Sequence, residues 1–127
     1  SCRCGQLRAT PTGDPVRVSV CHCLDCQRRT GSAFSAQGRW PADQVTIDGQ
    51  SKIWSQLADS GNRITHHFCA DCGSTVHYSI DGKFEGLVAI PLGAFADPHF
   101  PAPQFSVWET RKHRWVEILG DQVERSD

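Results

Sequence analysis

The chain has 127 residues, of which 39% are hydrophobic and 21% are charged, and its formal net charge is −1. This near-neutral balance lacks the basic footprint that binding to nucleic acid or to an anionic membrane surface requires. No apolar run reaches the 18 residues that a membrane-spanning helix needs, so we expect neither nucleic acid nor a membrane as a partner. A chain of this length buries roughly 65–70% of its unfolded surface, which is enough for one core. We therefore expect a single domain over residues 1–127.

Short runs of strand-forming residues follow one another along the chain. Val16, Val18 and Val20 alternate with polar residues, which is the pattern of a half-buried strand that ends next to Cys21. The predicted strands are residues 7–10, 16–20, 32–40, 44–47, 52–57, 63–68, 75–80, 87–91, 105–109 and 115–119. Helical signals are confined to residues 27–29 and to a turn near residues 92–95. The pattern predicts a mostly β fold, either a sandwich or an irregular twisted barrel.

The seven cysteines fall into three tight clusters, which are Cys2 and Cys4, then Cys21, Cys23 and Cys26, then Cys69 and Cys72. An odd number of cysteines cannot all pair in disulfides, and a redox motif would have to open a helix in a βαβ setting that this β-rich chain does not offer. Seven divides into four plus three. Four thiolates close a tetrahedral zinc site, whereas three leave one position open for water or substrate. We therefore expect two zinc ions, one structural and one available for chemistry.

The same cysteines predict the compartment. Reduced thiolates persist in the cytoplasm, whereas disulfide frameworks belong to small secreted domains. The first residues already belong to a cysteine cluster and not to an apolar leader. We therefore expect a soluble, cytoplasmic protein.

The segment Cys69-Ala70-Asp71-Cys72-Gly73 has the form of a zinc knuckle. Two cysteines three apart point both sulfurs at one ion from a tight turn, and the following glycine accepts the positive φ that such a turn needs. Cys2 and Cys4 are the natural second half of this site, since the entropy of closing a loop grows only slowly with its length. The rival partition completes the knuckle with two of the three middle cysteines and leaves Cys2 and Cys4 free.

In the preferred partition, Cys21, Cys23 and Cys26 remain together for the open site. His22 lies inside this array, and because its neighbours are better placed as ligands, we expect it on the surface or beside the ligands. Asp25 either orients a ligand or is a solvated turn residue. Three histidines in predicted strands are expected to be packing or edge residues, and these are His66, His67 and His77.

Four motifs resemble, in order, those of the glutathione-dependent formaldehyde-activating enzyme family. They are Ser1-Cys2-Arg3-Cys4-Gly5, Cys21-His22-Cys23-Leu24-Asp25-Cys26-Gln27, Thr30-Gly31-Ser32-Ala33-Phe34 and Phe68-Cys69-Ala70-Asp71-Cys72-Gly73-Ser74. The resemblance runs from Ser1 to about Glu117, and all seven cysteines match in order and spacing. It implies a tent-like, zinc-bound, all-β fold (Mss4-like) with few short helices, in a domain that the family shares with a centromere-associated protein.

The resemblance also implies the two zinc sites and an activity. It assigns Cys2, Cys4, Cys69 and Cys72 to a structural zinc, and Cys21, Cys23 and Cys26 to a catalytic zinc. The implied enzyme is a carbon–sulfur lyase similar to S-hydroxymethylglutathione synthase, with a small thiol such as glutathione and formaldehyde or a related aldehyde as its partners. Zinc removes the proton of a bound thiol at neutral pH. Because three thiolates weaken its Lewis acidity, we favour activation of the nucleophile over polarisation of the carbonyl.

The segment after the open site is expected to contact the thiol. The expected cofactor-binding residues are Gln27, Arg28, Thr30 and Ser32. Arg28 and the adjacent Arg29 match the carboxylates of glutathione, and the hydroxyls supply hydrogen bonds. In the alternative, the arginines are solvated and residues 30–32 only form a turn.

Two further expectations concern the aromatic and the charged residues. The tryptophans and phenylalanines are expected in the core, with an aromatic substrate box as the less favoured alternative, and the charged run at residues 109–114 is expected on a solvated hairpin. Gln104 stands between Pro103 and the downstream Trp115, where the family often has a histidine, so a substrate that differs from the family's is one implication. A non-catalytic two-zinc module that binds a protein partner is the alternative function, and a closed second zinc site would favour it. A redox protein ranks third.

Overall fold

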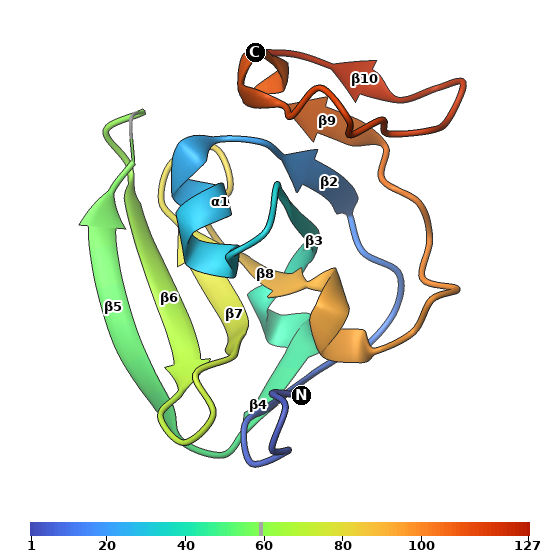
Figure 1. Cartoon of the computed structure of the whole chain (residues 1–127). Helices are drawn as coiled ribbons and strands as arrows, with labels where there is room; N and C mark the ends of the chain where they lie inside the picture. Colours follow the sequence, from blue (N-terminus) through green and yellow to red (C-terminus); the bar gives the residue numbers. More distant parts are fainter. Residues whose placement is uncertain (59) are drawn as a thin grey trace.

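The structure is a computed structural model that describes residues 1–58 and 60–127. The described residues are mostly β, which confirms the predicted fold class, and they contain one short α-helix (Figure 1). The strands are β1 (Arg8–Pro11), β2 (Arg17–Cys21), β3 (Ser35–Pro41), β4 (Val45–Asp48), β5 (Ser51–Leu57), β6 (Arg63–Cys69), β7 (Thr75–Ile80), β8 (Leu87–Pro91), β9 (Phe105–Val107) and β10 (Glu124–Arg125). Among the described residues, no helix is long and apolar enough to cross a bilayer.

The strands form one large sheet and one small one. The large sheet has the order β10-β9-β2-β3-β8-β7-β6-β5, and β1 pairs with β4 in the small sheet. The pairings of β9 with β2 and with β10 are parallel, whereas the other pairs are antiparallel. In Figure 1, helix α1 (Leu24–Thr30) lies beside the β5–β6–β7 arm, and the C-terminal strands β9 and β10 lie beyond β2. The large sheet thus brings residues from both ends of the chain to the neighbourhood of α1.

Helix α1 starts and stops at residues that explain its shortness. Cys23 is its N-cap, and the Cys23 sulfur accepts a hydrogen bond from the backbone N–H of Cys26 at 3.3 Å. Gly31 ends the helix in the left-handed region, with φ +68°, where a glycine has no steric penalty. Asp25 lies in the first turn and arginines in the last, which suits the helix dipole. The cap cysteine therefore couples the start of α1 to the middle cysteine cluster.

The core lies beside the first and last cysteine clusters. Leu7, Trp40, Val76 and Ile90 are buried there together with sulfur-bearing side chains of those clusters. Two phenylalanines of the segment after β8 cover Trp40, at ring-centroid distances of 5.6 Å and 6.3 Å. A metal site at this place is therefore backed by the best-packed part of the protein.

The C-terminal third differs from the predicted pattern. The expected strand at residues 115–119 is wrong, and the preceding strand ends at Val107. Trp108 has φ +57° and turns the chain into the 3-10 helix η3 (Glu109–Arg111), so the charged run does not form a hairpin. The last pairing is made instead by β10, which the sequence pattern did not indicate. A two-residue strand carries no periodicity from which it could be predicted.

The expectation that all four tryptophans lie in the core is also wrong. Trp40 is buried, whereas Trp54, Trp108 and Trp115 have exposed fractions of 54%, 38% and 76%. Trp54 lies on β5, the edge strand of the large sheet, where one side of the ring has no neighbouring strand to cover it. Its position next to the cysteine-bearing helix makes it relevant to the site described below.

Candidate metal centres and the adjoining cavity

The first and last cysteine clusters meet in one four-sulfur group. The sulfurs of Cys2, Cys4, Cys69 and Cys72 all lie within 4.8 Å of one another. Four sulfurs placed 2.3 Å from one tetrahedral zinc ion are ~3.8 Å apart. The Cys2–Cys4 and Cys4–Cys69 sulfur distances are both 3.6 Å, so this donor set fits zinc. The rival partition, in which two middle cysteines complete the knuckle, is not formed.

Backbone turns and polar groups hold these four sulfurs. The N–H of Gly73 donates to the carbonyl of Cys69 at 2.8 Å, and Gly73 has φ +80°, as the knuckle turn requires. The side chain of Gln6 donates to the Cys69 sulfur at 3.1 Å. Backbone hydrogen bonds, first from Ser74, lower the pKa of Cys72 to about 5. Cys69 is fully buried, so an ion at this site is shielded on that side by protein.

The three middle cysteines form a second, smaller group. The sulfurs of Cys21, Cys23 and Cys26 lie within 4.8 Å of one another and are all half-buried. Hydrogen bonds from Cys21 and then from Cys23 lower the pKa of Cys26 to about 2, while the Cys23 hydrogen bond is the largest cause of a raised pKa at Cys21. Such a group favours one thiolate stabilised by its neighbours, which is the charge that attracts a soft cation. Three sulfurs fit a zinc ion that keeps one coordination position open.

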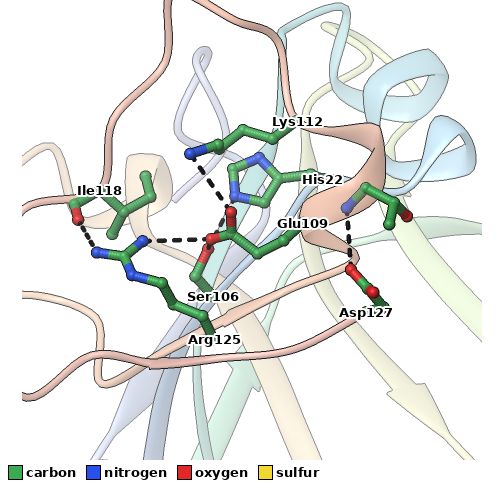
Figure 2. A network of polar contacts seen from close by, with 8 residues as sticks. His22, Ser106, Glu109, Lys112, Ile118, Arg125 and Asp127 are labelled. Atoms are coloured by element: carbon green, nitrogen blue, oxygen red, sulfur yellow. Dashed lines mark hydrogen bonds and ion pairs between the residues drawn. The ribbon is translucent and has the colours of Figure 1, made fainter.

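His22 lies between two of these cysteines but points away from them into the protein. Its side chain is fully buried, which excludes the surface, one of the two places expected for it. Figure 2 shows its Nε2 beside Ser106, at 2.9 Å from Oγ, and the Ser106 hydroxyl donates to Glu109 Oε1 at 2.5 Å. Because the one hydroxyl proton of Ser106 is used toward Glu109, His22 must donate from Nε2. Burial lowers the pKa of His22, in agreement with a neutral ring.

This contact ties the middle cysteine cluster to the C-terminal segment. Glu109 forms ion pairs with Lys112 and Arg125, each at 3.3 Å (Figure 2). Burial raises the pKa of Glu109, but the Ser106 hydroxyl and the two cations outweigh it and hold the pKa below its usual range. The backbone N–H of His22 also donates to the carbonyl of Val107 at 3.0 Å. Sequence spacing could not reveal this network, although the alternation Cys21, His22, Cys23 does place the histidine on the opposite side of an extended chain.

The first predicted thiol contact, Gln27, faces the same C-terminal segment. Its amide N–H group donates to the carbonyls of His22 and Arg111, at 2.8 and 3.1 Å. Its carbonyl oxygen lies 2.9 Å from Nε2 of His113. Gln27 therefore reinforces the attachment that begins at His22.

A cavity of about 530 Å³ opens beside the middle cluster and is lined by both Cys23 and Cys26. Helix α1 contributes Asp25, Arg28 and Arg29 to one wall. The opposite wall comes from β5, β6 and β7 and carries Trp54, Ile64, His66, Phe68 and Tyr78, with Gln56 and Thr75. Its size is that of a typical small-molecule site.

A second cavity of about 590 Å³ adjoins the first. The two share Arg29, Gly73 and Thr75, and the second also touches Cys2 and Thr30. The hydroxyl of Thr30 donates to the carbonyl of Cys26 at 2.8 Å and accepts from the N–H of Ser32 at 3.1 Å. Of the predicted thiol contacts, Arg28 thus lies in the first cavity, Thr30 lines the second, and Ser32 is exposed and lines neither.

The histidines of the large sheet and Gln104 are the remaining residues that the sequence analysis named. His66 and His77 are buried in the sheet, and desolvation lowers the pKa of each to about 4. The rings of His67 and His77 stack at 4.2 Å, as expected for packing histidines. Gln104 is exposed and lines neither cavity, while its backbone N–H donates to the carbonyl of Val18. The departure at Gln104 is therefore not placed where it could contact a molecule in either cavity.

Comparisons with known proteins agree with the cysteine geometry. The chain is 26% identical over 116 residues to a protein of Fusarium vanettenii, and 28% identical over 113 residues to one of Penicillium rubens. Both relatives are provisionally named glutathione-dependent formaldehyde-activating enzymes. These matches cover 82% and 80% of this chain, but 61% and 59% of the relatives. The chain therefore spans about three fifths of the length of these relatives.

A family model provides the broader match. It is described as glutathione-dependent formaldehyde-activating enzyme, and it matches residues 1–111. The matched range includes all seven cysteines, the helix α1 and both cavities. The chain belongs to the glutathione-dependent formaldehyde-activating enzyme family.

Proposed function

We propose that this protein is a zinc-dependent carbon–sulfur lyase that adds glutathione or a similar small thiol to formaldehyde or a related aldehyde, or catalyses the reverse step. The observation that carries the proposal is the opening of the three-cysteine group into a cavity with cationic side chains. The family of the chain supports the reaction, since the relatives' names refer to glutathione and formaldehyde. Within this proposal, the four-cysteine group holds a structural zinc.

In the proposed reaction the thiol sulfur bonds to the carbonyl carbon, the electron pair of the C=O bond moves to oxygen, and that oxygen takes up a proton. The thiol loses one proton, so atoms and charge balance without an oxidant or reductant. Cys21, Cys23 and Cys26 would hold a zinc ion, which would favour the thiolate form of a bound thiol. Cys23 and Cys26 both line the cavity, which supports an open coordination position on that side.

The chain's own residues bind and orient the thiol. Arg28 and Arg29 present guanidinium groups that form paired hydrogen bonds with carboxylates, and glutathione carries two carboxylates. Asp25 on the same wall suits its ammonium group. Thr30 and Ser32 lie at and just after the end of α1. Gln27 donates to the carbonyl of His22, so we assign it the role of positioning the three-cysteine group and not of contacting the thiol. Holding both reactants in one cavity converts a bimolecular encounter into an oriented one.

The test uses metal-loaded protein, ¹³C-formaldehyde and glutathione, with adduct formation and breakdown measured by exchange NMR. The uncatalysed rate is measured in parallel because the reaction also runs in water. Acceleration that disappears in Cys23→Ser, with the fold checked by circular dichroism, supports the proposal. Ser55→Ala is the matched control, because the Ser55 hydroxyl lies 3.1 Å from that of Thr65 and neither residue lines either cavity. No acceleration of formaldehyde or of the larger aldehydes described below, with two metals bound per chain, would overturn it and favour the non-catalytic binding module.

A further inference from the structure

The cavity beside Cys23 and Cys26 has two walls of different chemistry. The α1 wall is charged, whereas the facing sheet wall is mainly apolar. Ile64, His66 and Phe68 alternate along β6, so all three side chains face the same side of the sheet. Every second residue of this part of β6 therefore contributes its side chain to the sheet wall of the cavity.

Three rings cross this wall in a row. Trp54 on β5 is paired in register with His66 on β6, which is in turn paired with Tyr78 on β7. The Trp54 and His66 rings are stacked, with centroids 6.1 Å apart and planes at 20°, and the His66 and Tyr78 centroids are 5.3 Å apart. Arg29 closes the far end, with its guanidinium carbon 5.1 Å from the Tyr78 ring centroid. We call Trp54, His66 and Tyr78 the aromatic row.

The aromatic row offers little to a peptide-like thiol. Desolvation lowers the pKa of His66 to about 4, so its ring is neutral near pH 7, and Nδ1 of that ring is buried without a partner among the described residues. Against these mainly apolar rings the amide and carboxylate groups of glutathione lose hydration and regain fewer hydrogen bonds than they would on the charged α1 wall. The charged α1 wall suits those groups better.

Both reactants must nevertheless meet at the cysteines, where the two walls come together. Formaldehyde has two heavy atoms and would leave the apolar wall uncovered. A flat, apolar substituent on the carbonyl carbon would instead lie against the exposed ring of Trp54, which is backed by the buried rings of His66 and Tyr78, and would remove apolar surface from water. We propose, resting on the function proposed above, that the aldehyde substrate of this protein carries an aryl or similarly apolar group that lies against Trp54, beside His66 and Tyr78.

The experiment compares aldehydes at constant glutathione with metal-loaded protein. Formaldehyde, acetaldehyde and phenylacetaldehyde are each assayed against their own uncatalysed rates by NMR. We expect an acceleration for phenylacetaldehyde at least about tenfold above that for acetaldehyde, as is common for one filled apolar pocket. In Ile64→Trp, which fills the cavity, this ratio should fall by about tenfold. Ile53→Trp is the matched control, because Ile53 neighbours Trp54 but does not line the cavity.

A binding measurement supplies a readout that does not depend on turnover. The unreactive alcohol 2-phenylethanol should shift the indole N–H resonance of Trp54, whereas ethanol should not. The resonance is assigned by its loss in Trp54→Phe. The shift should be lost in Ile64→Trp and kept in Ile53→Trp. Circular dichroism of both variants identifies a misfolded one, in which case Ile64→Phe replaces Ile64→Trp.

The outcomes separate this inference from the proposed function. Acceleration of formaldehyde without a preference for phenylacetaldehyde keeps the lyase and overturns the apolar substrate. An equal loss for all aldehydes in Ile64→Trp also overturns it, because the cavity would then hold the thiol. If no aldehyde is accelerated while two metals are bound, the proposed function fails and the substrate inference fails with it.

Discussion

The two cysteine groups differ in how the fold supports them. The four-cysteine group joins two cysteine pairs that lie 65 or more positions apart, and it lies against the buried core, with Cys69 fully buried. The three-cysteine group comes from six consecutive residues, is half-buried, and faces a cavity. A site that closes a long loop constrains the whole chain, whereas a local site constrains one turn. The comparison teaches that similar sulfur groups can be built into a buried core at one place and beside an open cavity at the other.

The largest expected effect is the loss of folding in Cys69→Ser. A structural zinc site contributes about 10 kcal/mol or more to folding, which is comparable with the whole stability of a small domain. We expect the variant to lose its cooperative thermal transition, as followed by circular dichroism, and to bind less metal. A folded variant with normal metal content would contradict the predicted contribution of the four-cysteine group to folding.

Cys23→Ser tests the three-cysteine group in the same way. Because the three-cysteine group spans one turn and faces the cavity, the variant should stay folded, keep one metal per chain and lose the proposed reaction. Thermal unfolding and metal analysis are done on the same sample as the formaldehyde exchange assay. If Cys23→Ser lost its fold to the same extent as Cys69→Ser, the two groups would not differ in their contribution to folding, and the comparison would fail.

A smaller effect is expected when the support of His22 is removed. Ser106→Ala leaves Nε2 of His22 without its partner and disconnects Glu109 from the cysteine cluster. Neighbours that orient a metal site typically change its affinity by about 10–100-fold. Titration with Co²⁺ should therefore show weaker binding at the three-cysteine group and unchanged binding at the four-cysteine group.

Ser106→Thr keeps a hydroxyl and should restore most of the Co²⁺ affinity. Ser55→Ala removes a hydroxyl hydrogen bond on the other arm of the sheet and serves as the control. Equal weakening of both metal sites in Ser106→Ala would mean that the network only stabilises the fold and does not act on one cluster.

The smallest expected effect concerns pH. Burial lowers the pKa of His66 and of His77 to about 4 in the folded protein, below the ordinary value of 6.5. Between pH 6.5 and pH 4 the unfolded chain binds more protons, so stability should fall as the pH falls through this window. The urea midpoint should fall less steeply with decreasing pH in the His77→Phe variant than in the wild type. Metal release on acidification affects both proteins, so the difference between them isolates the histidine.

The sequence predicted those features that depend on local spacing. The cysteine clusters, the alternation that ends β2 at Cys21, and the knuckle glycine all depend on neighbours within a few residues, and the structure contains each of them. The expected strand at residues 115–119 failed because Trp108 adopts a positive φ and redirects the chain, and hydrophobic alternation does not report that conformation.

The support of the site escaped sequence reasoning because it is assembled across strands. His22 and Ser106 are 84 residues apart and meet only because β2 pairs with β9. Trp54, His66 and Tyr78 form a row only once the register of β5, β6 and β7 is known. An aromatic residue on a strand is expected in the core on average, and an edge strand beside a cavity is the exception that a single sequence does not mark.

The spacing of the two cysteine groups also has a consequence for the order of events during synthesis. Cys21, Cys23 and Cys26 leave the ribosome within six residues of one another, so they can capture a metal ion early in translation. The four-cysteine group is complete only when Cys72 has been made, and β9, which supports His22, follows later still. The three-cysteine group is therefore complete first, yet the contacts around it form last. Under the proposed function, metal delivery to the nascent chain, and not only to the finished protein, would affect how much of the protein is active.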